Sequence, residues 1–124
     1  MKPFPKKWKK TPPELVEFLH ASVKGIPCRL KPMFGYPVYF INDNMFIGTH
    51  MESLILRLGE KDRAALISEN DEVHPFEPLP GRVMKEYVVL PESLYRDKEA
   101  FRKWLKRSLA YVGGLPPKKK KKGS

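Results

Sequence analysis

The chain has one cysteine, no long apolar run and no secretory signal, and each absence narrows what the protein does. Cys28 cannot form a disulfide within the chain, so a reducing cytoplasm is the expected compartment. No segment approaches the roughly 18 apolar residues of a membrane span, and the lysine-rich N-terminus lacks the apolar core of a secretory signal. The sequence therefore predicts a cytoplasmic protein without a membrane span.

The residues that carry catalysis or bind metals are also sparse. The three histidines show no metal-ligand spacing with one another or with Cys28, which itself lies in no nucleophile motif. The glycines are isolated and form no phosphate-binding loop. We therefore expect no catalytic residue, no metal and no cofactor.

Positive charge is abundant, but only at the two ends of the chain. The net charge is +10; residues 1–13 hold five lysines and no acid, and residues 118–122 are five more lysines. The 14 remaining basic residues between these ends balance 14 acidic ones. Such charge runs either keep a chain soluble or attract phosphate backbones without sequence preference, and an indole can stack on bases. The candidate nucleic-acid contacts are Lys6, Lys7, Trp8, Lys9, Lys10, Lys118, Lys119, Lys120, Lys121 and Lys122.

Composition divides the chain into three parts: a basic segment 1–13, one domain at 14–117 and a lysine-rich tail 118–124. Within the domain, apolar periodicity and turn residues predict an α+β fold in the order α-β-β-β-α-β-β-α, with helices covering an antiparallel sheet. The predicted elements are a helix after Thr11 as its cap, a hairpin of 38–41 and 45–48, a strand 53–58, a helix 60–70, an edge strand or rigid loop 74–82, a strand 84–91 and a helix 101–112 stopped by a left-handed Gly113-Gly114.

The alternation of residue types also predicts which side chains face the core. Leu54, Leu56 and Leu58 share one face of their strand, with Ile55 and Arg57 on the other. In the later strand, Met84, Val88 and Leu90 are expected to pack the core. The last helix carries an apolar stripe from Phe101 through Trp104 to Val112, so Trp104 should be buried.

The opposite face of that helix is basic. Lys103, Lys106 and Arg107 lie there, with Arg102 beside them. A row of cations on a helix can meet phosphates, but a helix packed on a core also needs a polar outer face, and Glu99 dilutes the charge. We interpret this row as the solvated face.

Two short segments remain as candidate binding surfaces. In the first, Gly35 lies between Phe34 and Tyr36. In the second, Arg82, Lys85 and Tyr87 surround the entry to a strand, where they either bind an anion or acidic partner or serve the turn and the core. A small-anion or metabolite site near Arg82, with or without enzyme activity, is the weaker alternative function.

Four segments, in this order, resemble the TfoX N-terminal domain family: "MFGYPVYFINDNMFIG", "LILRLGEKDRAAL", "HPFEPLPGRVMKEYVVLPE" and "WLKRSLAYVGGLPPKKKKK". The resemblance implies the same α+β order in a two-layer domain similar to secretion chaperones, with a binding surface and no catalytic residues. The family is named after a bacterial competence regulator, a transcriptional coactivator with a second, C-terminal helical domain.

The sequence and the resemblance together favour a small non-enzymatic regulator or adaptor that acts through protein contacts. The alternative is an accessory nucleic-acid-binding protein that uses its lysine-rich ends. The sequence leaves open whether the protein is a monomer or a dimer.

Overall fold

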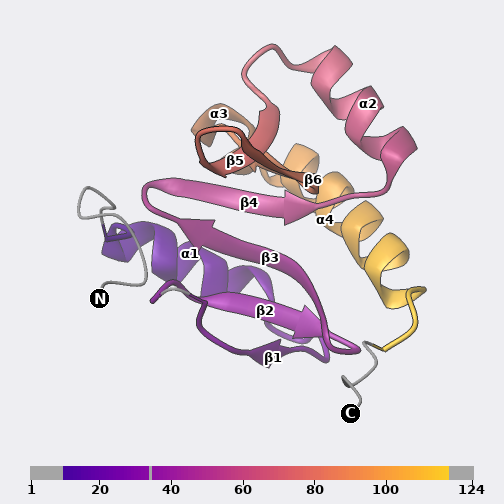
Figure 1. Ribbon diagram of the computed structural model, residues 1–124. Helices are drawn as coiled ribbons and strands as arrows, with labels where there is room; N and C mark the ends of the chain where they lie inside the picture. The colour runs from indigo at the N-terminus through magenta and orange to yellow at the C-terminus, as the bar shows by residue number, and fades with distance from the viewer. Residues whose placement is uncertain (1–9, 34, 118–124) are drawn as a thin grey trace.

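A computed structural model describes residues 10–33 and 35–117, which form one β-sheet with helices packed against it (Figure 1). The six strands follow the order β1-β2-β3-β4-β6-β5, and every neighbouring pair is antiparallel. The predicted fold class, α+β with an antiparallel sheet, is thus confirmed. The elements are α1 (Pro13–Ser22), β1 (Arg29–Leu30), β2 (Val38–Ile41), β3 (Asn44–His50), β4 (Ser53–Arg57), α2 (Glu60–Glu69), β5 (His74–Leu79), β6 (Arg82–Leu90), α3 (Glu92–Tyr95) and α4 (Lys98–Gly113).

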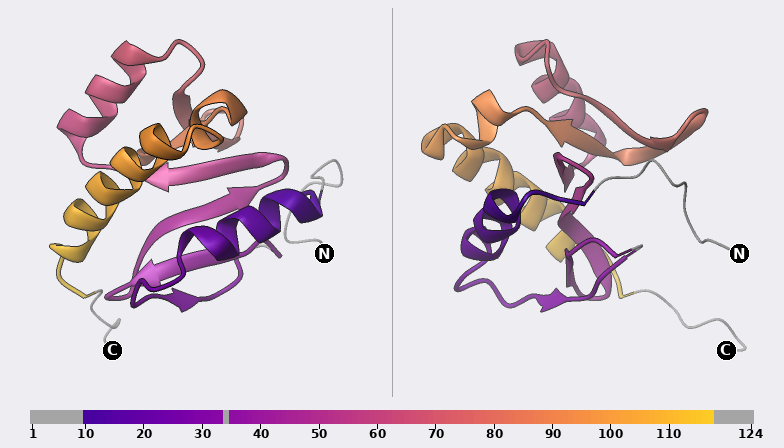
Figure 2. Two further views of the ribbon diagram at one scale, coloured as in Figure 1. Left: turned by 180° about the vertical axis from the view of Figure 1, so that it is seen from behind. Right: turned by 90° about the vertical axis from the view of Figure 1, so that its left-hand side faces the viewer.

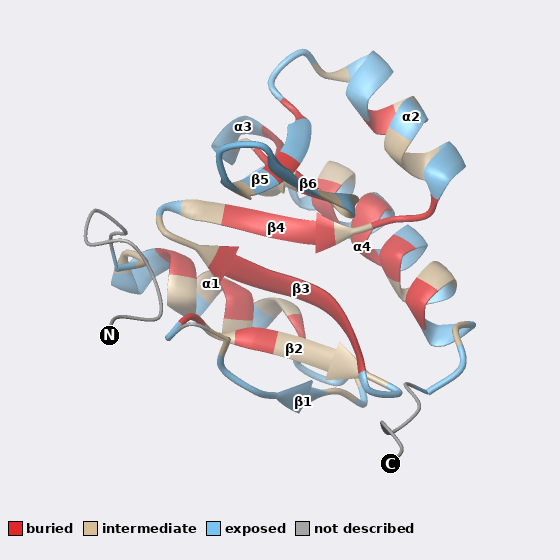
Figure 3. Cartoon of the chain, viewed as in Figure 1, coloured by how far each residue is buried: buried red, intermediate tan, exposed pale blue. Residues whose placement is uncertain are grey.

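The two faces of the sheet have different surroundings. Figure 2 shows α1 and α4 across one face, and the β5–β6 hairpin projecting on the opposite side. The main core lies under the helices, and Figure 3 shows β3 and β4 buried along most of their length. Leu54, Leu56 and Leu58 belong to this core as predicted, whereas Ile55 belongs to a second cluster on the other face.

Helix α4 contributes more buried residues to the core than any other described helix: Phe101, Trp104, Leu105, Ser108 and Val112. Asp97 caps it by accepting a hydrogen bond from the backbone N–H of Ala100 at 3.2 Å. Trp104 is only 2% exposed, which confirms its predicted burial. The predicted left-handed stop was wrong: Gly114 has φ −89°, so the helix ends with right-handed backbone.

Helix α1 begins at Pro13, and the predicted cap by Thr11 was wrong. The residue that precedes the helix is Pro12, which makes no side-chain cap. The Thr11 hydroxyl instead donates to the Thr49 hydroxyl at the end of β3, 3.0 Å away. Thr11 therefore fixes the start of the domain to the central part of the sheet.

Two short elements, β1 and α3, were not predicted. Strand β1 pairs with β2 through Arg29 and Leu30, and the Lys31 N–H donates to the Val38 carbonyl oxygen at 2.8 Å. In α3, the ring of Tyr95 lies 5.1 Å from that of Phe18, which is also 5.1 Å from Phe101. Helix α3 thus links α1 to α4 above the same face of the sheet.

Candidate functional site

The second apolar cluster lies on the sheet face that no described helix covers, which we call the open face (Figure 2). It draws side chains from the Met33 turn and from β2, β3, β4, β5 and β6. Its members are Val38, Met45, Ile55 and Phe76, which are buried, and Met33, Phe40, Met84, Tyr87 and Val89, which are partly buried. An apolar sheet face of this kind is normally covered by another layer.

A bulge between β2 and β3 brings the right side chains to this face. Tyr39 pairs with Ile47 but Phe40 pairs with Met45, so β3 holds one extra residue. As a result both Phe46 and Ile47 reach the helix-covered core, while Met45 faces the other way. The strict alternation of a regular strand would not allow this arrangement.

Gly48 provides the room for Val38 on the open face. A Cβ atom at Gly48 would lie 2.8 Å from Val38 Cγ2 and 3.1 Å from the carbonyl oxygen of Pro37. The first distance is shorter than real Cβ contacts, and the second is tighter than most of them. The close approach of β2 to β3 therefore depends on glycine at this position.

A row of three rings borders a small hollow in the open face. The His50 ring lies 5.2 Å from that of Tyr36 and 5.0 Å from that of Phe76. The hollow has a volume of about 50 Å³ and an almost wholly apolar lining that includes Met33, Met45 and Met84. It can hold the end of one apolar side chain.

Burial changes the acid–base behaviour of the polar rings in this row. It lowers the pKa of His50, because the charged imidazolium is poorly solvated there. It raises the pKa of the Tyr36 phenol, against a smaller opposing effect of a hydrogen bond with the backbone of Met51. Both groups are thus held neutral at physiological pH, as suits an apolar contact surface.

The β5–β6 hairpin extends past β4 as an arm, residues 76–85. Its pairing shifts twice, between Pro75 and Phe76 and again between Phe76 and Leu79. Gly81 turns the tip with φ +80°, and its N–H donates to Glu77 Oε2 at 2.6 Å. Bulges bend a hairpin, and here the bent arm places Phe76 and Met84 over the open face.

The same register shift corrects one prediction. Met84 was expected to share a face with Val88 and Leu90, but it packs in the open-face cluster with Tyr87 and Val89. Phe76 pairs with Met84 and Pro75 with Val88, so residues 85–87 have no counterpart on β5. Regular alternation would place Met84 and Val88 on the same face of β6. Because the three residues between them have no partner on β5, the two side chains lie on opposite faces.

Cations accompany the aromatic side chains at the border of this face. Lys31 Nζ lies 5.9 Å from the ring centroid of Phe40, and the Arg57 guanidinium lies 5.5 Å from that of Tyr87. Arg57 also forms an ion pair with Glu86 at 2.7 Å, and the Tyr111 hydroxyl donates to the same carboxylate at 2.9 Å.

Glu86 is held as an anion by these contacts. Burial alone would raise its pKa, but the hydrogen bonds from Arg57 and Tyr111 and the charges of Arg57 and Arg63 outweigh burial and lower it. Burial, together with the Glu86 hydrogen bond and charge, raises the pKa of Tyr111. The network connects α4 to the border of the open face.

The structure separates the sequence-predicted site residues into two groups. Phe34 lies outside the described residues; Gly35 forms a tight turn with φ +83°, and Tyr36, only 7% exposed, lines the hollow. Arg82 and Lys85 are exposed on the arm, and Tyr87 is partly buried beneath Arg57. An anion held by Arg82 and Lys85 would stay in contact with water, so the described residues form no enclosed site around them.

Sequence reasoning did not connect the methionines of the hollow with one another, and it missed Met45 and His50 as residues of the site. Met33, Met45 and Met84 lie in three separate segments, and only the strand order brings them together. The alternation around Ile55 was the one available signal, because it placed an isoleucine on the face away from the leucines.

The predicted nucleic-acid contacts lie outside the described residues, except for Lys10, which is exposed. Their attachment points are nevertheless defined. Thr11 is bonded to Thr49 near the last residue of β3, and the Asn44 side chain at the first residue of β3 donates to the carbonyl oxygen of Pro116 at 3.0 Å. The two basic segments therefore start from opposite ends of the same strand.

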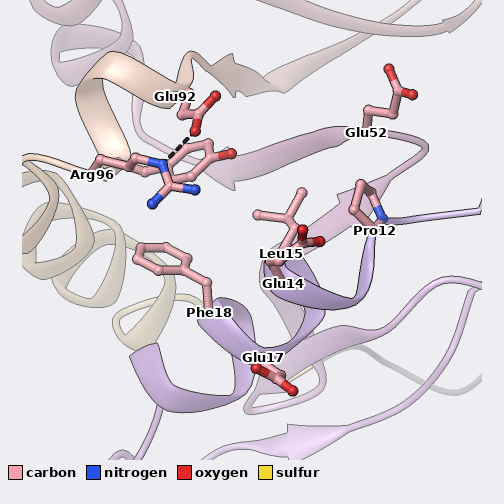
Figure 4. Close-up of a pocket in the computed structure, with 9 residues that line it drawn as sticks. Pro12, Glu14, Leu15, Glu17, Phe18, Glu52, Glu92 and Arg96 are labelled. Carbon is pink, nitrogen blue, oxygen red and sulfur yellow. Dashed lines mark hydrogen bonds and ion pairs between the residues drawn. The ribbon is translucent and has the colours of Figure 1, made fainter.

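A larger hollow of about 620 Å³ lies between α1 and α3. Four glutamates line it, but Figure 4 shows Glu17 and Glu52 pointing away from one another at its two ends. Glu92 forms an ion pair with Arg96 inside it. Within residues 10–33 and 35–117, no group of three or more His, Cys, Asp or Glu side chains is placed to hold a metal ion.

Cys28 is partly buried, and burial raises the pKa of its thiol.

The fold and its surfaces define a class: a small α+β domain with one helix-covered and one open sheet face. A family model, the TfoX N-terminal domain, matches residues 22–112, so the chain belongs to the TfoX N-terminal domain family. The predicted resemblance is confirmed. No curated protein and no solved structure matches the chain. Among the described helices, none has both the length and the apolar character needed to cross a membrane.

Proposed function

We propose that this protein is a small non-enzymatic regulator or adaptor in the cytoplasm, and that it binds another protein through the open face. The observation that supports this function is the second apolar cluster, on a sheet face that none of the described helices covers. The arm that carries Phe76 and Met84 of this cluster also exposes two apolar side chains, Leu79 and Val83, which are 37% and 51% exposed. Exposed apolar side chains close in the chain to a partly buried apolar cluster are typical of an interaction site.

Methionine suits this role because its side chain is flexible and polarisable. Three of the five methionines line the hollow. Such side chains adapt to the shape of a partner at little cost, as they do in other proteins that bind varied targets. The helix-covered core, by contrast, is built mainly from leucine, valine and aromatic residues.

The test is affinity capture from lysate with the full-length protein and two matched variants. Val83→Glu places a charge on the arm, and Ile67→Glu places one on α2, where the side chain is 37% exposed. Both changes are at exposed positions, so both variants should fold. We expect the parent and Ile67→Glu to retain the same specific protein and Val83→Glu to lose it. Identical proteins on all three would contradict a contact surface that includes the arm.

A second candidate function is non-specific nucleic-acid binding by the lysine-rich ends. The observation in its favour is that the two basic segments start at opposite ends of β3, so both can contact one extended polyanion. Replacing Lys118–Lys122 with serine should then weaken binding to a duplex and reduce its salt dependence by about one unit of log–log slope per lost phosphate contact. Unchanged affinity at every salt concentration would exclude a contribution from the tail.

A further inference from the structure

We infer that the partner segment that binds the open face is an amphipathic helix with acidic residues beside its apolar stripe. This inference rests on the proposed function and specifies the chemistry of the partner. The open face offers an apolar hollow and exposed cations near it, and the two edges of its sheet are either short or rich in proline. Each of these features favours one kind of partner segment over others.

The sheet edges argue against a partner that adds a strand. One edge strand, β5, contains Pro75 and Pro78 and is followed by Pro80, and proline has no N–H to donate. The other edge strand, β1, is only two residues long. A partner must therefore bind through side chains on the face. A helix satisfies its own backbone hydrogen bonds and presents side chains only, so it fits such a face.

The dimensions of the hollow agree with one helical anchor residue. Its volume of about 50 Å³ accommodates the end of one leucine or methionine side chain. Further residues of an apolar helical stripe would then contact the partly buried Met33 and Met84 at the border of the hollow. The bound helix would form a second helical layer, opposite α1 and α4.

The charges near the face favour an acidic partner. Lys31, Arg82 and Lys85 take part in no ion pair within the described part of the chain. The two carboxylates of the same hairpin are already engaged, Glu77 by the Gly81 N–H and Glu86 by Arg57 and Tyr111. The available charge is thus positive. Two copies of this chain placed face to face would oppose like charges, which disfavours a second copy as the occupant.

The experiment uses the full-length protein and three synthetic peptides of about 16 residues, long enough to form a helix when bound. The first carries leucines at i, i+4, i+7 and i+11 with glutamates beside them. The second has lysines in place of the glutamates, and the third is the acidic peptide with two central prolines. Fluorescence anisotropy gives the affinities, and the methyl resonances of ¹³C-labelled methionine report the hollow.

We expect the acidic peptide to shift the Met45 and Met84 resonances and to bind about tenfold more tightly than the lysine peptide. The proline peptide should not bind. In a protein with Arg82→Glu and Lys85→Glu, the preference between the first two peptides should reverse. The matched control, Arg102→Glu with Lys106→Glu on the outer face of α4, should retain the original preference, because both residues are exposed on the helical side.

Three results would overturn the inference: equal binding of the acidic and lysine peptides, equal binding of the proline peptide, or no change in the methionine resonances. The proposed function fails separately, since it fails when the Val83→Glu protein captures the same partner as the parent. Suppose that Val83→Glu loses the partner while the three peptides bind equally. The contact surface would then be correct, and the inference that the partner is an acidic helix would be wrong.

Discussion

The two faces of this sheet are built by the same strands but have different compositions and different covers. The helix-covered face packs Leu54, Leu56 and Val88, each without measurable exposure, against α1 and α4. The open face gathers methionines and aromatic rings, and much of it is only partly buried. Dense aliphatic packing gives stability, whereas flexible and aromatic side chains at a partly open surface suit recognition. The difference indicates that the helical side holds the fold together, and it is the reason why we propose the open side as the contact surface.

The largest expected effect is on the helix-covered face. Trp104→Ala should lower the free energy of unfolding by about 3–5 kcal/mol, because it removes a large buried ring and leaves a cavity. Denaturant unfolding of the purified protein measures this loss. Lys106→Ala, on the outer face of the same helix, is the control and should change stability by less than about 0.5 kcal/mol. A Trp104→Ala protein as stable as the parent would remove the asymmetry between the two faces.

The next effect tests the packing of the open face. Gly48→Ala should destabilise the protein by about 1–3 kcal/mol, because the new methyl group overlaps Val38 and must push β2 away. Gly113→Ala, at the end of α4, is the matched control. Nothing lies within 4 Å of a Cβ atom at Gly113, and alanine there should stabilise the helix by about 0.5–1 kcal/mol. Equal effects of the two changes would show that β2 does not depend on the close approach at Gly48.

A smaller effect is expected where the two faces meet. Tyr111→Phe removes the hydrogen bond to Glu86 and should cost about 1 kcal/mol. It should also raise the pKa of Glu86, since one of the groups that hold the carboxylate ionised is lost. Chemical denaturation and NMR titration of the Glu86 side chain measure these two changes. Tyr95→Phe is the control, because within the described residues the Tyr95 hydroxyl makes no hydrogen bond.

The sequence predicted the helix-covered face much better than the open one. The leucine alternation in β4, the Trp104 stripe and the Asn42-Asp43 turn, whose two residues have positive φ, all follow from local patterns. Strand β1 and helix α3 have two and four residues, too few to show a period. A register shift depends on how two strands pair, so the β3 bulge and the position of Met84 could not be inferred from either strand alone.

The candidate site was predicted only in fragments for the same reason. Tyr36 was identified because a glycine precedes it, and Tyr87 because cations surround it in the sequence. Their shared face becomes apparent only when β6 is placed beside β4. Residues from distant segments that meet through strand order leave no local pattern to detect.

The smallest predicted effect concerns the pH dependence of the open face. Burial holds the pKa of His50 below its ordinary value of 6.5, so near that pH the unfolded chain binds a proton more readily than the folded protein. The stability due to neutral His50 is therefore present above about pH 6.5 and is lost as the pH falls through this value toward the folded pKa.

In His50→Phe, the ring contacts with Tyr36 and Phe76 are kept, but the new side chain does not titrate. The decrease in unfolding free energy between pH 7.5 and 5.5 should therefore be smaller than in the parent. If His50→Phe shows the same decrease as the parent, His50 is as well solvated as an exposed histidine, and the hollow is not the apolar site that distinguishes the open face.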